Sequence, residues 1–180
     1  MANGFRVVSF DYRGFGKSAD FAINPDFLFH HEFAVDLDSV IKQTREKYSN
    51  DRIGLYAMSM GTYVSLLRKE KIDFLVAEGF YHNPEAVVER IKVNKGSDVS
   101  FPVNTMAVSK MKNRVPVLIF CADKDKITPT ADAREFAKRN KVTLVEFEGE
   151  HLGGLMKFTK KTVGDEYVDR VVAFLEANKI

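Results

Sequence analysis

The stretch that decides the fold is Ile53-Gly54-Leu55-Tyr56-Ala57-Met58-Ser59-Met60-Gly61-Thr62-Tyr63-Val64. A short apolar run precedes Ser59, and a helix-like pattern follows it through Arg68. This order predicts a strand, a sharp turn and a helix, with the serine at the turn. Such a turn holds the serine in strained backbone with its hydroxyl exposed, and the first amides of the next helix favour negative charge nearby. We therefore interpret Ser59 as a candidate nucleophile.

Strand-like and helical patterns alternate along the rest of the chain. Short runs of β-forming residues predict strands at 5–10, 53–58, 74–77, 115–120 and 142–147. Helical spacing or a helix-starting proline predicts helices at about 33–48, 60–68, 84–91, 106–111, 128–138 and 167–175, whereas 19–31 is predicted to be irregular. Alternation of this kind predicts an α/β fold, a mostly parallel sheet of about five strands with flanking helices. Ligands of such sheets bind beyond the carboxyl ends of the strands.

Length and composition limit the possible classes of protein. The 180 residues fit a single domain, 1–180, and the 27 basic and 25 acidic residues are interspersed, so no nucleic-acid partner is indicated. No apolar run approaches the ~20 residues of a membrane helix, and no signal peptide is recognisable, so no membrane partner and a cytoplasmic location are expected. Cys121 cannot form an internal disulfide and is predicted to be a buried strand residue. The oligomeric state is not readable from the sequence.

Three residues of complementary chemistry follow the predicted ends of three different strands. Ser59 comes after the second strand, an aspartate after the fourth and His151 after the fifth. A serine hydroxyl needs a base to take its proton, histidine suits that task near neutral pH, and an acid holds the imidazole in the right tautomer. Asp123 and Asp125 both follow the fourth strand, and Glu78 follows the third. From position alone, each of these three carboxylates is available as the acid.

Four ordered motifs resemble those of the α/β-hydrolase superfamily. Residues 10–18 (Phe-Asp-Tyr-Arg-Gly-Phe-Gly-Lys-Ser) are similar to the D-x-R-G-x-G-x-S segment, and residues 57–61 match the G-x-S-x-G nucleophile elbow except for Ala57. Residues 122–129 are similar to the G-x-x-D-x-x-x-P acid loop except for Ala122, which replaces the glycine, and this register selects Asp125. Residues 149–151 match the G-x-H turn.

The resemblance implies a catalytic triad of Ser59, Asp125 and His151. It implies a serine hydrolase that acts on carboxylic esters or related small acyl compounds through an acyl-enzyme, without a metal or organic cofactor. By the same resemblance, residues of about 80–114 form a small lid insertion over the pocket.

The resemblance is incomplete before Phe5. A complete member of the superfamily has earlier strands, one of which precedes a loop that supplies half of the oxyanion hole. That strand also lies between the strand at Phe5 and the elbow strand, so here those two must pair directly or stay apart. Only one oxyanion donor, the amide of Met60, is identifiable. The segment Met1–Gly4 resembles the capped end of a helix. The alternative is therefore a weak or inactive hydrolase-fold protein, or an N-terminally incomplete gene product.

Two other classes of function have some support in the sequence, a nucleotide-binding protein and a non-catalytic binding protein. Residues 14–18 (Gly-Phe-Gly-Lys-Ser) follow a predicted strand, but a phosphate-binding loop requires a glycine where Asp11 stands, and an acidic residue there repels phosphate. A non-catalytic binding or scaffold protein with the same fold is favoured by the missing oxyanion loop. The presence of Ser59, Asp125 and His151 together argues against it.

Overall fold

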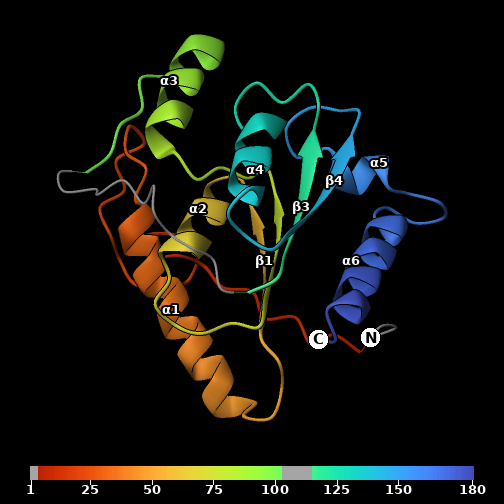
Figure 1. The fold of residues 1–180 in the computed structure, drawn as a ribbon. Coiled ribbons are helices and arrows are strands. Elements are labelled where there is room, and N and C mark those ends of the chain that lie inside the picture. Colours follow the sequence, from red (N-terminus) through yellow and green to blue (C-terminus); the bar gives the residue numbers. More distant parts are fainter. Residues whose placement is uncertain (1–3, 103–114) are drawn as a thin grey trace.

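Four parallel strands form the sheet within the residues that the computed structural model describes, 4–102 and 115–180 (Figure 1). The strands are β1 (Gly54–Met58), β2 (Phe74–Glu78), β3 (Val117–Ala122) and β4 (Val142–Phe147), and they lie side by side in that order. All three neighbouring pairs are parallel. Their carboxyl ends therefore meet at one edge of the sheet, where ligands of parallel sheets bind.

The sheet is covered by helices on both faces, which explains its apolar sequence. All six residues of β3 are buried, and a strand buried on both faces reads as a continuous apolar run. Alternate residues of β2 join different clusters: Leu75 packs in the core beneath α1 (His30–Lys47) and α2 (Met60–Leu67), and Val76 packs against α6 (Asp165–Ala177). Figure 1 shows α1 and α2 on one side of the sheet and α6 on the other.

Three further helices complete the described fold. They are α3 (Pro84–Lys95), α4 (Thr130–Ala137) and the short α5 (Gly154–Lys157). Helix α3 begins as predicted at Pro84, with the side chain of Asn83 accepting the N–H of Ala86, and it runs past the predicted end to Lys95. Gly96 adopts φ +67°, the left-handed conformation in which glycine commonly ends helices.

The strand predicted at residues 5–10 is not formed, so the described sheet has four strands and not five. Phe5 packs against one hydrophobic cluster and Phe10 against the other, whereas Val7 and Val8 are 75% and 48% exposed. A strand is stable only when its N–H and C=O groups pair with a neighbouring strand. This segment does not pair with β1, so aromatic packing positions it without a strand ladder. The predicted class, α/β with a parallel sheet flanked by helices, is confirmed.

The prediction that residues 19–31 are irregular is wrong at its end, because His30 and His31 belong to the first turn of α1. The start carries no recognisable signal, since Phe29 occupies the cap position without a side-chain hydrogen bond. His30 is fully buried, and its Nε2 atom lies 2.8 Å from the hydroxyl of Tyr81. The predicted helix over Met106–Met111 and the helix end over Met1–Asn3 lie outside the described residues.

Candidate active site

Ser59 occupies the sharp turn between β1 and α2. Its backbone adopts φ +47° and ψ −119°, a conformation that costs a non-glycine residue on the order of 1–3 kcal/mol unless its surroundings enforce it. Hydrogen bonds to two neighbouring residues enforce this conformation. The N–H of Ser59 donates to the carbonyl of Glu78 at 2.9 Å, and the carbonyl of Ser59 accepts the N–H and the hydroxyl of Thr62 at 2.9 and 2.7 Å. The predicted strand, turn and helix are therefore present, with the serine at the turn.

Ala57 fits the turn without strain, although it replaces the first glycine of the motif. It is a buried residue of β1, and positive φ angles among non-glycine residues occur at Ser59 but not at Ala57. A Cβ atom added to Gly61 would lie 4.0 Å from the Cβ of Ala57, an ordinary contact. The strained residue of this turn is thus the serine itself.

Asp125 lies after β3 in a dense set of hydrogen bonds. Its Oδ1 atom accepts the N–H groups of Ile127 and Thr128, each at 2.8 Å, and its Oδ2 atom accepts the hydroxyl of Thr128 at 2.6 Å. Burial acts to raise the pKa of Asp125, but the hydrogen bonds from His151 and Thr128 and the charge of His151 outweigh it and lower the pKa to about 2. The carboxylate is therefore ionised at neutral pH and can act only as an acceptor.

His151 connects the other two side chains. Its Nδ1 atom lies 2.6 Å from Oδ2 of Asp125, and its Nε2 atom lies 3.0 Å from Oγ of Ser59. Because Asp125 is an acceptor, Nδ1 carries the proton in the neutral imidazole, and the lone pair of Nε2 faces the serine hydroxyl. The structure thus brings together the three residues that were predicted as a triad, in the arrangement that a general base requires.

Neither of the alternative carboxylates contacts His151. Oδ1 of Asp123 accepts the N–H of Gly149 at 3.0 Å, and the N–H of Asp123 donates to the carbonyl of Phe147. Asp123 therefore braces the turn before the histidine. The carboxylate of Glu78 accepts the N–H of Gly154 at 2.6 Å. The hydrogen bond to the imidazole belongs to Asp125.

Two residues of the site were not predicted. Thr128 was interpreted only as a helix start, yet its hydroxyl bonds Asp125 and lies 3.2 Å from Nδ1 of His151. A usable signal was its position three residues after an aspartate, where Asp side chains commonly accept local backbone N–H groups. The second residue, Gly79, has φ +64°, and a Cβ atom there would lie 2.8 Å from Cε1 of His151. Gly79 and His151 are distant in the chain, so the local sequence around Gly79 gives no sign of this contact.

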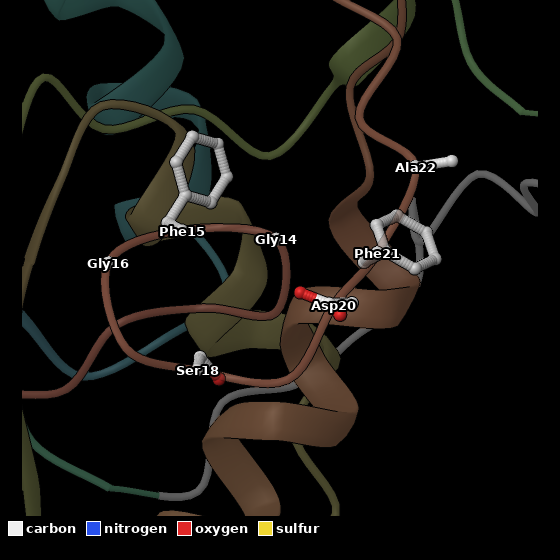
Figure 2. Close-up of a pocket in the computed structure, with 7 residues that line it drawn as sticks. All are labelled: Gly14, Phe15, Gly16, Ser18, Asp20, Phe21 and Ala22. Carbon is white, nitrogen blue, oxygen red and sulfur yellow. The ribbon is translucent and has the colours of Figure 1, made fainter.

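The loop at residues 11–18 does not form a phosphate cradle. Oδ2 of Asp11 accepts the N–H of Lys17 at 3.1 Å, and it lies 2.0 Å from the place where a Cβ of Gly16 would stand. A carboxylate thus occupies the loop interior, where a phosphate would need amide donors. A hollow of about 350 Å³ lies beside this loop, lined by Gly14, Phe15, Gly16, Ser18, Asp20, Phe21 and Ala22 (Figure 2). None of these lining residues belongs to the Ser59, Asp125 and His151 set.

Residues 4–102 and 115–180 contain neither a metal-binding cluster nor a membrane-spanning helix. No three His, Cys, Asp or Glu side chains in these ranges gather as ligands for a metal ion. None of the described helices combines the length and the apolar character that crossing a bilayer requires.

Solved structures of known proteins share this architecture. An esterase of Pyrococcus furiosus superposes with a TM-score of 0.76 at 21% identity, over 98% of this chain and 72% of that one. The chain has the α/β-hydrolase fold. Mouse alpha/beta hydrolase domain-containing protein 10 matches with a TM-score of 0.62 at 17% identity, over 94% of this chain and 76% of that one. An esterase from Exiguobacterium antarcticum matches with a TM-score of 0.58 at 18% identity, over 92% and 80% of the two chains.

In sequence, one family model matches the N-terminal part of the chain. The family model described as "Serine aminopeptidase, S33" matches residues 1–76, which is less than half of the chain. The matched part includes Ser59 but neither Asp125 nor His151. No curated protein matches the chain in sequence.

Proposed function

We propose that the protein is a serine hydrolase that acts on carboxylic esters or related small acyl compounds. Ser59 is the nucleophile, His151 the general base and acid, and Asp125 the residue that orients the imidazole. The observation that carries the proposal is the continuous chain of contacts, 3.0 Å from Ser59 Oγ to His151 Nε2 and 2.6 Å from His151 Nδ1 to Asp125 Oδ2. The α/β-hydrolase fold supports this proposal, but one fold can carry many functions, so the proposal depends on the site itself.

The reaction proceeds in two acyl transfers. Nε2 of His151 takes the proton of Ser59 as Oγ attacks the acyl carbonyl, and the ionised Asp125 stabilises the imidazolium. When the tetrahedral intermediate collapses, His151 gives that proton to the departing alcohol, and an acyl-enzyme remains on Ser59. Water then attacks the acyl group with His151 again as base, and the acid is released.

The set of donors that would stabilise the oxyanion is the least complete part of this site. The N–H of Met60, at the first position of α2, has no acceptor within its own helix, and we assign it as one donor to the developing negative charge. Removal of one of two such donors typically lowers turnover by ~10²–10³. We assign no second donor among the described residues, and this favours a second candidate function, a weak or inactive hydrolase-fold protein that binds acyl compounds.

Hydrolysis of p-nitrophenyl acetate and butyrate separates the two candidates. The hydrolase predicts steady release of p-nitrophenol by the wild type, reduced to background in Ser59→Ala and His151→Ala. Ser39→Ala is the matched control, since among the described residues the hydroxyl of Ser39 bonds the carbonyl of Val35 alone, on an exposed part of α1. Equal rates for the wild type and Ser59→Ala would show that Ser59 is not the nucleophile.

A further inference from the structure

Glu78, the last residue of β2, is a carboxylate buried in an unusual environment. It is 1% exposed, and no lysine, arginine or histidine forms an ion pair with it among the described residues. Oε1 accepts the N–H of Gly154, and the hydroxyl of Tyr167 interacts with the carboxyl group, although within residues 4–102 and 115–180 no donor reaches Oε2 at normal hydrogen-bond distance. Burying a carboxylate with so little compensation is unfavourable, and an apolar residue of similar size is cheaper for the fold alone.

The groups around Glu78 do not supply the missing positive charge. Burial raises the pKa of Tyr167, and the charges of Tyr56 and Glu78, together with hydrogen bonding to both side chains, raise it further. Burial and the charge of Glu78 also raise the pKa of Tyr56. Both tyrosines are therefore neutral at physiological pH. The core therefore offers no cation to offset the burial of the Glu78 carboxylate, and the remaining contacts of Glu78 lie in the candidate active site.

Glu78 contacts both of the turns that carry the proposed nucleophile and base. Its backbone carbonyl accepts the N–H of Ser59 at 2.9 Å, and its Oε1 atom accepts the N–H of Gly154 at 2.6 Å. Gly154 lies three residues after His151. One residue thus connects the Ser59 turn with the His151 loop.

The His151 loop needs such an external restraint. Leu152 adopts φ +60°, a conformation that a leucine keeps only where its surroundings determine it. A Cβ atom added to Gly154 would lie 2.9 Å from both carboxylate oxygens of Glu78, so the close approach of the amide depends on glycine. The contact between Glu78 and Gly154 fixes this loop three residues beyond the imidazole.

We propose that Glu78 is a positioning residue, which holds the His151 loop at the distance from the Ser59 turn that the Oγ–Nε2 contact requires. This role rests on the proposed hydrolase function for its catalytic consequence, but the geometry it sets can be measured separately. Glu78 does not touch the imidazole, and it acts through the backbone of Gly154.

The test compares Glu78→Leu with Glu78→Gln. Leucine removes the acceptor, whereas the glutamine amide oxygen can still accept the N–H of Gly154. Two readouts are used: the rate of covalent labelling by a fluorophosphonate, and the low-field ¹H NMR signal of the His151 Nδ1 proton. We expect Glu78→Leu to lower the labelling rate about tenfold or more, as small misplacement of reacting groups does. We expect it also to shift or broaden the Nδ1 signal, while Glu78→Gln stays close to the wild type in both.

Two further variants complete the design. Glu146→Leu is the control for loss of a carboxylate, because Glu146 pairs with Arg134 on the exposed side of β4, and it should leave both readouts unchanged. Gly154→Ala disturbs the same contact from the other partner and decides the question if Glu78→Leu does not fold. We expect it to lower labelling and to shift the Nδ1 signal.

The outcomes separate this proposal from the hydrolase proposal. If the wild type is not labelled, the hydrolase proposal fails, and the Nδ1 signal alone decides the role of Glu78. A signal that is shifted in Glu78→Leu and kept in Glu78→Gln supports the positioning role in either case. The positioning role would be overturned if Glu78→Leu and Gly154→Ala were both labelled at the wild-type rate and both kept the Nδ1 signal of the wild type.

Discussion

The Nε2 atom of His151 lies 3.0 Å from Oγ of Ser59, although 92 positions separate the two residues in the chain. They meet because β1 and β4 are parallel members of one sheet, which brings their carboxyl ends to the same edge. The ring is held on its other side by Asp125, which follows β3.

Thr128 supports the acid and the base at once, so its hydroxyl should matter for reactivity. Thr128→Val keeps the shape but removes the donor to Asp125 Oδ2 and the contact with His151 Nδ1. Hydrogen bonds to charged groups contribute about 1.5–3 kcal/mol, so we expect lower stability and about tenfold slower fluorophosphonate labelling. Thr130→Val is the control, because within the described part of the chain the hydroxyl of Thr130 bonds the carbonyl of Ala122 alone, so this variant should change stability without changing labelling. Equal labelling of Thr128→Val and the wild type would contradict the role of Thr128.

Gly79 should tolerate no side chain, because the His151 ring packs against it. Gly79→Ala meets Cε1 of His151 at 2.8 Å and Cδ2 of Leu152 at 3.0 Å, in addition to the strain of φ +64°. Gly96→Ala carries similar backbone strain, φ +67°, with nothing within 4 Å. Backbone strain should lower the free energy of unfolding of both variants by roughly 1–2 kcal/mol. Only Gly79→Ala should lose more stability than this and react slowly with the fluorophosphonate. Urea unfolding and labelling rates of the pair measure the difference, and indistinguishable variants would refute the packing argument.

The hydrogen bonds of Asp125 should make stability depend on pH at the acid end. The folded pKa, about 2, lies below the ordinary 3.8. A lowered pKa contributes stability that is present above pH ~4 and is lost as the pH falls toward ~2, about 2 kcal/mol in total. The difference in free energy of unfolding between the wild type and Asp125→Asn should shrink by that amount between about pH 5 and pH 2. A difference that does not change over this range would mean that Asp125 is not held in its ionised form.

Gly61 should accept alanine, in spite of its place in the elbow motif. Its added Cβ would make an ordinary contact with Ala57 at 4.0 Å, and alanine in a helix is about 0.5–1 kcal/mol more favourable than glycine. Gly61→Ala should therefore unfold at a higher temperature than the wild type. Gly54→Ala is the opposite case, because its Cβ would lie 2.0 Å from the ring of Phe74, and it should unfold at a lower temperature. Calorimetry that ranks the two variants in the reverse order would contradict the packing described for β1.

The sequence predicted what depends on local pattern. Ser59 and His151 could be chosen because apolar runs locate the strands, and each residue follows a strand end. Strand ends alone left three carboxylates open as the acid, and Asp125 was selected by the resemblance of residues 122–129 to the acid loop of the α/β-hydrolases. The proximity of Ser59, Asp125 and His151 is observed, and their catalytic roles stay a prediction. Local pattern did not predict the unpaired state of residues 5–10, because a run of β-forming residues becomes a strand only when a partner lies beside it.

Contacts between distant segments could not be predicted from the sequence. The burial of Glu78 against Gly154 joins the end of β2 to the start of α5, and nothing in either local sequence indicates the other. The first turn of α1 was missed for a related reason. His30 is held by the hydroxyl of Tyr81 and by surrounding aromatic rings, and no capping residue announces the helix.

The central claim is that Ser59 is a nucleophile activated by His151, and covalent labelling tests it most directly. The wild type, Ser59→Ala, His151→Ala and Ser39→Ala are incubated with a fluorophosphonate, and the adduct is located by peptide mass spectrometry. We predict one adduct per chain, on Ser59, in the wild type and in Ser39→Ala, none in Ser59→Ala and strongly slowed labelling in His151→Ala. An adduct on another residue, or no adduct on the folded wild type at any concentration of the probe, would contradict the claim.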